Sequence, residues 1–243
     1  TADYSALRDD ERAPLYHKAY DGTYPPGSTF KMVTGSAGLR AGVITPNETV
    51  FCGGHYAFGN RRFHCWKRGG HGRLNLHEAI KHSCDVYFYE VARRLGPERI
   101  ADEAKAFGLG ERYELGMTGG ASGIVPTDSW KRGRYNEPWY DGETINYGIG
   151  QGYLTVSPLQ LAVMSARIAI GNGDQLMPNM VGLGPDLPAS ERFGSMPPKD
   201  ILDQLRAGMY GVTSEPGGTA PLAGDINFQG IRMSGKTGTA QVR

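Results

Sequence analysis

The stretch Tyr24-Pro25-Pro26-Gly27-Ser28-Thr29-Phe30-Lys31 places a hydroxyl and an amine three residues apart, directly behind a Pro-Pro-Gly breaker. The breaker and an apolar stripe that begins at Phe30 predict a helix over residues 28–39. Residues i and i+3 of a helix are neighbours on one face. Lys31 can therefore lie against the Ser28 hydroxyl and act as the base that a serine nucleophile requires.

By itself this pair is weak evidence for function, because a serine that caps a helix and is followed by an exposed lysine is an ordinary structural feature. In the functional interpretation the amine of Lys31 must be neutral, and burial or nearby cations would lower its pKa in that direction. The free N–H groups and the dipole of the helix start would also favour a negative charge that develops beside Ser28.

Two further motifs contain the same kinds of group. Ser83-Cys84-Asp85 precedes an apolar-faced segment, and Lys236-Thr237-Gly238-Thr239 lies near the end of the sequence. The structural interpretation is a helix cap for the first motif and an edge strand protected by a charge for the second. The functional interpretation is a second hydroxyl that relays a proton, and a strand whose lysine and threonines meet a carboxylate while Gly238 permits close approach.

The joint occurrence of the three motifs, in this order, is the signature of penicillin-binding proteins and class A β-lactamases. The chain resembles the transpeptidase domain of class B penicillin-binding proteins, and within them the elongation-type penicillin-binding protein 2 family. Asp85 favours this branch, because division-type relatives usually carry asparagine there. The resemblance covers nearly the whole sequence and rests on residues 24–31, 69–72, 83–89, 146–152, 157–162 and 234–241.

The resemblance implies a mixed α+β fold of the penicillin-binding transpeptidase and serine β-lactamase type. An antiparallel sheet flanked by helices would lie beside a mostly helical subdomain, with the site between them. Residues 1–243 are expected to form one transpeptidase domain. Thr1 stands where a complete chain would have methionine, so we expect an excerpt of a longer protein. The sequence stops at Arg243, just past the Lys-Thr-Gly motif, so the C-terminal strands and helix of the family are expected to be absent from it, as are the membrane anchor and the pedestal domain. The implied location is the periplasmic side of a bacterial inner membrane.

The resemblance also implies a reaction, peptidoglycan D,D-transpeptidation during cell elongation. Ser28 would attack the D-Ala-D-Ala bond of a stem pentapeptide, and an amine of a neighbouring stem would capture the acyl-enzyme. Lys31 would be the general base, Ser83 the proton relay and Asp85 its orienting group. The implied substrate-binding residues are Lys236, Thr237, Gly238 and Thr239, and the N–H groups of Ser28 and Thr239 would form the oxyanion hole.

The implied partners are the stem peptide, the acceptor amine, β-lactam antibiotics, a membrane glycosyltransferase and other elongation-complex proteins. No catalytic cofactor is expected. The sequence leaves three alternatives open: a serine β-lactamase, a non-enzymatic β-lactam sensor and a D,D-carboxypeptidase. The β-lactamase needs a base for deacylation, and neither Glu137 nor Glu143 fits the Glu-x-x-x-Asn pattern of class A enzymes.

Three cysteines are too few for a disulfide scaffold. Cys52, Cys65 and Cys84 together with His71 could supply four ligands to a structural Zn²⁺ ion. The alternative is a Cys52–Cys65 disulfide with Cys84 as a small buried residue. Some elongation-type relatives are similar in having a structural zinc here, which favours the metal.

Composition excludes other classes of function. The net charge of +1 and a 21% share of charged residues give no global field for nucleic acid. We interpret the basic clusters at residues 61–68 and 131–134 as solvated faces.

The patterns of apolar residues and breakers predict helices at 74–81, 86–95, 98–107, 159–170 and 199–210. They also predict a loop or hairpin at 50–73, a turn-rich stretch at 111–142, loop and short strand at 174–200, and strands at 15–19 and 231–242.

Overall fold

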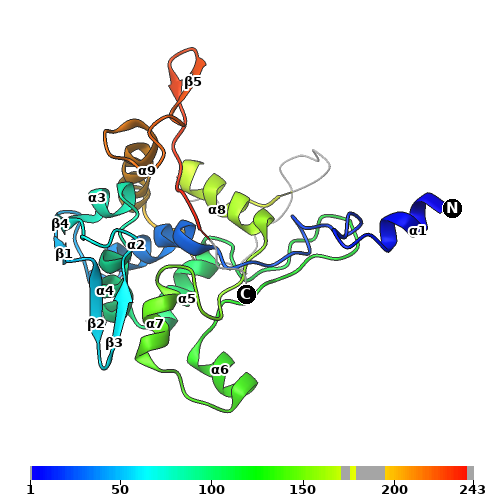
Figure 1. Cartoon of the computed structure of the whole chain (residues 1–243), viewed down its shortest axis with the longest axis horizontal. Helices are drawn as coiled ribbons and strands as arrows, with labels where there is room; N and C mark the ends of the chain where they lie inside the picture. The colour runs from blue at the N-terminus through cyan, green and yellow to red at the C-terminus, as the bar shows by residue number, and fades with distance from the viewer. Residues whose placement is uncertain (1, 171–175, 179–194, 240–243) are drawn as a thin grey trace.

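The computed structural model describes residues 2–170, 176–178 and 195–239, in which helices dominate and short strands pair between them (Figure 1). The mixed α+β class is confirmed. In chain order the elements are α1 Ala2–Arg8, η1 Gly27–Phe30, α2 Lys31–Arg40, β1 Val50–Cys52, β2 His55–Phe58, β3 Arg61–His64, β4 Gly72–Leu74, α3 Leu76–Lys81, α4 Asp85–Leu95, α5 Pro97–Ala106, α6 Asp128–Tyr135, α7 Asp141–Tyr147, α8 Pro158–Ile170, α9 Lys199–Ser214, β5 Asp225–Phe228 and β6 Ile231–Arg232.

Helix α2 forms the centre of the molecule, with α3, α4, α5 and α9 packed around it (Figure 1). All of its residues from Lys31 to Gly38 are buried. Gly38 lets α4 approach closely, because a Cβ there would lie 2.8 Å from Cγ1 of Val91. Since the nucleophile motif begins this helix, Ser28 and Lys31 are attached to the most buried element of the described chain.

Within the described ranges the strands form three two-stranded antiparallel ladders, β1–β4, β2–β3 and β5–β6. Each ladder is smaller than the sheet that the resemblance implies. The loop or hairpin predicted at 50–73 is an antiparallel hairpin of β2 and β3, enclosed by the β1–β4 ladder. Gly70 closes this unit, because a Cβ there would lie 2.2 Å from the carbonyl oxygen of Cys52. The unit therefore brings the segments before β2 and after β3 together.

The helices predicted from apolar periodicity at 28–39, 74–81, 86–95, 98–107, 159–170 and 199–210 are all present, within a few residues of their predicted ends. Two predictions are wrong. Residues 15–19 form turns rather than a strand, and the turn-rich stretch 111–142 contains α6 and the start of α7. These helices depend on polar caps: Thr127 accepts a hydrogen bond from the Trp130 N–H, and Glu143 from the Tyr140 N–H.

The strand predicted at 231–242 is limited to β6, and residues 233–239 have no ladder partner in the described chain. Their backbone bonds go elsewhere, since Met233 N–H donates to Gly224 O at 2.9 Å and Gly235 N–H to Met209 O at 3.2 Å. Residues 240–242 of that prediction, and most of the stretch predicted as loop and short strand at 174–200, lie outside the described residues.

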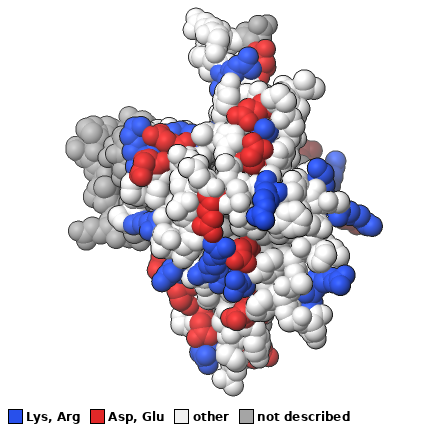
Figure 2. All heavy atoms as spheres, turned by 90° about the vertical axis from the view of Figure 1, so that its left-hand side faces the viewer, with Lys and Arg blue, Asp and Glu red and all other residues white. Residues whose placement is uncertain are grey.

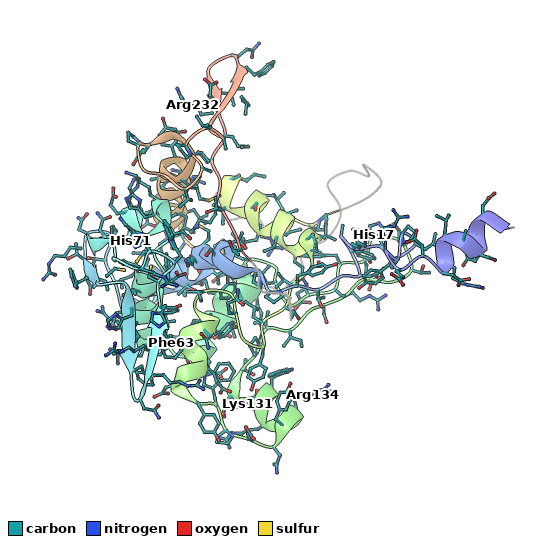
Figure 3. The ribbon with its side chains drawn as sticks, viewed as in Figure 1. His17, Phe63, His71, Lys131, Arg134 and Arg232 are labelled. Atoms are coloured by element: carbon teal, nitrogen blue, oxygen red, sulfur yellow. The ribbon has the colours of Figure 1, made fainter. Side chains whose placement is uncertain are left out.

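The basic cluster at 131–134 is not a uniformly solvated face. Lys131 is buried and its ammonium lies 2.6 Å from Oε1 of Glu143, whereas Arg134 on the same helix is exposed (Figure 3). On the face that carries β1–β4, Figure 2 shows basic and acidic side chains interspersed. Across the described ranges, no helix combines the length and the apolar character that crossing a membrane requires.

Candidate active site

A tight turn presents the candidate nucleophile. Ser28 lies in η1, whose first residue, Gly27, has φ +56° and donates its N–H to the carbonyl oxygen of Gly150 at 3.0 Å. Gly150 has φ +75°, and a Cβ on it would lie 2.2 Å from Gly27 O. The half-buried Ser28 side chain thus faces a cleft from a turn that the 146–152 loop holds in place.

Lys31 is fully buried, and its ammonium joins the first motif to the second. It donates to Asp85 Oδ1 at 2.7 Å, to the Ser83 carbonyl oxygen at 2.9 Å and to Ser83 Oγ at 3.2 Å. The expected bond to the Ser28 hydroxyl is not formed, and no described residue hydrogen-bonds that hydroxyl. Among the described residues the candidate nucleophile thus has no hydrogen-bond partner, while the amine one helical turn away is held by the Ser83-Cys84-Asp85 segment.

The second motif occupies a strained turn between α3 and α4. Ser83 has φ +51°, a left-handed conformation that is uncommon outside glycine and that costs on the order of 1 kcal/mol. Trp66 fixes this turn from outside: its backbone N–H donates to Asp85 Oδ2 at 2.9 Å, and its indole N–H donates to Ser83 O at 3.1 Å. The Asp85 carboxylate is thus held between Trp66 and Lys31.

The third motif reaches the same turn. The Lys236 ammonium donates to Ser83 Oγ at 2.7 Å, so two ammonium groups share that hydroxyl oxygen. Desolvation, and then the positive charge of Lys31, lower the pKa of Lys236 to about 7. Gly238 lies beside the nucleophile turn, since a Cβ there would be 3.0 Å from Cγ2 of Thr29. The two lysines therefore meet at the Ser83 hydroxyl, and Asp85 joins them through its bond to Lys31.

A cleft of about 1410 Å³ opens over this arrangement. Ser28, Ser83, Asp85, Thr237 and Thr239 all line it, as the sequence motifs predict. Asp85 contributes the single carboxylate among its lining residues in the described chain. The cleft is therefore bordered by hydroxyls, with the two lysines behind them.

Sequence reasoning missed other residues of the cleft. Trp66, Asn146, Tyr153 and Thr219 line it as well. Asn146 belongs to a segment that contributed to the resemblance, and Trp66 follows Cys65, so both had a local signal. Thr219 had none, because its partner Thr237 is 18 residues away.

The four predicted metal ligands also come together. The ligand atoms of Cys52, Cys65, His71 and Cys84 lie within 4.8 Å of one another, and the three cysteines are free and buried. Nδ1 of His71 is 3.6 Å from Sγ of Cys52 and 3.5 Å from Sγ of Cys65. Figure 3 places His71 on the side of the molecule that carries α3. The Cys52–Cys65 disulfide, the alternative for these residues, is not present.

The chemistry of this donor set suits zinc. A hydrogen bond from the Cys84 thiol lowers the pKa of Cys65 to about 5, so one sulfur in the group is readily a thiolate. The same bond, together with burial, raises the pKa of Cys84. Burial lowers the pKa of His71, which favours the neutral imidazole that metals bind. Three soft sulfurs and one imidazole nitrogen match a closed structural zinc site, although His71 Nε2 is buried without a partner in the described residues.

Comparison with known proteins identifies close relatives. The family model of the penicillin binding protein transpeptidase domain matches residues 1–243. The peptidoglycan D,D-transpeptidase MrdA of Haemophilus influenzae is 37% identical over 99% of this chain and 38% of its own length. The chain thus spans about two fifths of the length of the curated relatives that it matches.

Solved structures of penicillin-binding proteins are similar to this chain over nearly its whole length. PBP2 of Pseudomonas aeruginosa, in complex with WCK 5153, superposes with a TM-score of 0.89 at 36% identity, over 99% of this chain and 53% of that one. PBP2 of Helicobacter pylori, in its complex with MreC, gives 0.87 at 33% identity, over 100% of this chain and 44% of that one.

Proposed function

Because the chain belongs to the penicillin-binding protein transpeptidase domain family, we propose that it is a peptidoglycan D,D-transpeptidase that works through an acyl-enzyme on Ser28. Residues 1–243 would act as one transpeptidase domain. The observation that carries the proposal is the convergence of the three motifs at one cleft, where Lys31 and Lys236 both bond to Ser83 Oγ and Ser28 lines the same cleft.

In the acylation step, Ser28 Oγ bonds to the carbonyl carbon of the penultimate D-alanine. The Ser28 proton passes to the amine of Lys31, which must be neutral at that moment. The C–N bond to the terminal D-alanine then breaks, and a proton reaches the leaving nitrogen through the Ser83 hydroxyl. Asp85, which accepts a hydrogen bond from Lys31, orients this amine. Backbone N–H groups of Ser28 and Thr239 would stabilise the oxyanion.

In deacylation, the amine of a neighbouring stem attacks the ester, and the proton path runs in reverse. The terminal carboxylate of the donor would be bound at Lys236, Thr237 and Thr239. Asp85 is the single carboxylate along the described part of the cleft and is bound to Lys31. It is therefore not free to activate a water molecule, which favours a transpeptidase over a β-lactamase.

The proposal is tested with a synthetic stem pentapeptide that ends in D-Ala-D-Ala, incubated with and without an acceptor amine. With the acceptor we expect continued release of D-alanine and a new amide product, whereas without it the release should stop once Ser28 is acylated. Ser28→Ala abolishes both, and Ser5→Ala, at an exposed serine, serves as the matched control. Release of D-alanine with water as the sole acceptor would indicate a carboxypeptidase instead, and full activity in Ser28→Ala would contradict the proposal.

We also propose that Cys52, Cys65, His71 and Cys84 hold a structural Zn²⁺ ion. With four protein ligands it would have no open position, so it would stabilise the fold without taking part in the reaction. It would connect the 50–73 unit to the turn that carries Ser83. Protein purified without a chelator should contain about one zinc per chain. A Cys52–Cys65 disulfide found by non-reducing peptide mapping would contradict this.

The cellular setting is proposed on the same basis. The elongation-type relatives suggest a periplasmic domain of a protein anchored in the bacterial inner membrane, active with a membrane glycosyltransferase and other proteins of cell elongation. Because PBP2 of H. pylori forms a complex with MreC, a protein of the MreC type is the first partner to test. β-Lactams would acylate Ser28. Co-purification of the full-length protein from membranes with these partners tests the setting. If a label attached to the protein were found in the cytoplasm alone, the proposed setting would be contradicted.

A further inference from the structure

A short turn after α9, residues 215–219, lies between the second and third motifs. It folds back on the end of the helix, with Gly218 N–H donating to Glu215 O at 3.1 Å and Ala220 N–H to Val212 O at 3.0 Å. A Cβ on Gly218 would lie 2.4 Å from the carbonyl oxygen of Val212. The turn is therefore packed against α9 at a distance that glycine alone permits.

One end of the turn is bound to α3. The Glu215 carboxylate lies 3.0 Å from Nε2 of His77 and 3.1 Å from the ammonium of Lys81. His77, Glu78 and Glu215 could in principle hold a metal ion, but the Lys81 ammonium also lies 3.5 Å from Glu78. The Lys81 ammonium thus already pairs with both carboxylates, and the group is an ionic contact between α3 and the turn.

A second contact links the turn to the residue next to Ser83. Nδ1 of His82 lies 2.9 Å from the carbonyl oxygen of Gly217. Because a carbonyl oxygen only accepts, Nδ1 carries the proton in this bond. The turn is consequently fixed relative to the segment that contains the second motif.

The other end of the turn reaches the third motif. Oγ1 of Thr219 lies 2.8 Å from Oγ1 of Thr237, and both side chains line the cleft. A substrate carboxylate only accepts hydrogen bonds, so Thr237 must donate its hydroxyl proton to it. The bond between the two threonines then has one possible direction, with Thr219 donating to Thr237. That bond also polarises the Thr237 hydroxyl and strengthens its donation to the carboxylate.

We propose that Thr219 is a positioning residue for carboxylate recognition, a role that rests on the proposed function. It orients the Thr237 hydroxyl toward the substrate. The contacts of Glu215 to α3 and of Gly217 to His82 fix its position relative to Ser83. No sequence motif marks it, and it acts through Thr237 without contacting the reacting atoms.

The test compares the second-order rate constants for acylation of Ser28 by a penicillin and by the methyl ester of the same penicillin. Thr219→Val keeps the shape of the side chain and removes the hydroxyl. We expect it to slow acylation by the free acid about three- to tenfold, the loss expected for one hydrogen bond. The methyl ester lacks the carboxylate, so it should acylate Thr219→Val and the wild type at nearly the same rate.

Three further variants separate positioning from a general structural effect. Thr219→Ser should restore most of the rate, and Thr49→Val, at an exposed threonine, should react like the wild type. In the Thr237→Val background, adding Thr219→Val should cost little more, because the second residue acts through the first.

Two outcomes would overturn the role of Thr219: equal rates for Thr219→Val and the wild type, or equal slowing of the acid and the ester. A wild-type protein that neither compound acylates would instead contradict the proposed function, and with it the role of Thr219.

Discussion

At the scale of single residues, Ser83 Oγ is contacted by two lysines in different surroundings. Lys31 is buried and bound to a carboxylate, whereas Lys236 is partly buried and lies near a like charge. The two lysines share one hydroxyl but differ in environment. Differences of this kind assign separate proton-handling roles to similar groups.

The pH dependence of acylation should report on Lys236. Its pKa is lowered to about 7, so it is protonated below that pH and neutral above it. If the cation binds the carboxylate or supplies a proton to Ser83, the acylation rate constant falls as pH rises through about 7. Lys236→Arg, which stays charged, should remove this fall. A wild-type rate that rises steadily from pH 6 to pH 9 would contradict the role of the cation.

Asp85 should matter for both stability and rate. In the wild type the Lys31 ammonium and the Trp66 N–H bind separate oxygens of the Asp85 carboxylate. Asp85→Asn leaves one acceptor oxygen for these two donors. We expect the free energy of unfolding in urea to fall by about 1–3 kcal/mol, because one buried donor loses its partner, and acylation to slow. Asp9→Asn, at an exposed pair with Arg8, is the control and should behave like the wild type. Unchanged stability in Asp85→Asn would rule out the shared carboxylate.

At the scale of elements, the site depends on close contacts between loops and helix ends. The 146–152 loop supports the nucleophile turn, the strained turn before α4 carries Ser83, and the turn after α9 reaches Thr237. These segments belong to different parts of the chain, and α2 is the central helix against which they are assembled.

Gly150 provides a test of this support. An alanine there meets both an unfavourable φ of +75° and Gly27 O at 2.2 Å. Gly42→Ala is the matched control, because it has a similar φ of +65° and no atom within 4 Å. We expect Gly42→Ala to cost about 1 kcal/mol of stability and Gly150→Ala more than that. Gly150→Ala should also slow acylation, which the control should not. Equal effects of the two variants on stability and rate would show that the contact to Gly27 is unimportant.

At the scale of the whole molecule, the sequence predicted those features that depend on local pattern. Helices α8 and α9 have apolar periodicity, and their positions were predictable. Helices α6 and α7 depend on caps such as Thr127 and on the ion pair of the buried Lys131 with the half-buried Glu143, which join residues that periodicity does not relate.

The same distinction holds for the site. The motif residues were identifiable because their spacing and order are distinctive, and their meeting in one cleft is what the motifs predict. Their bonding was not predictable: helical spacing favours a contact of Lys31 with Ser28, whereas the folded chain bonds Lys31 to Ser83 and Asp85. Thr219 and Trp66 contribute through partners far away in the sequence, which local pattern does not reveal.

In the proposed reaction Ser28 is the nucleophile that becomes acylated. The most direct measurement is incubation of the protein with a penicillin, followed by intact mass and tryptic peptide mapping. We expect one adduct with the mass of the intact β-lactam, located at Ser28 in the peptide of residues 19–31, and none in Ser28→Ala. An adduct on any other residue, or no adduct in the folded protein, would contradict the proposed reaction.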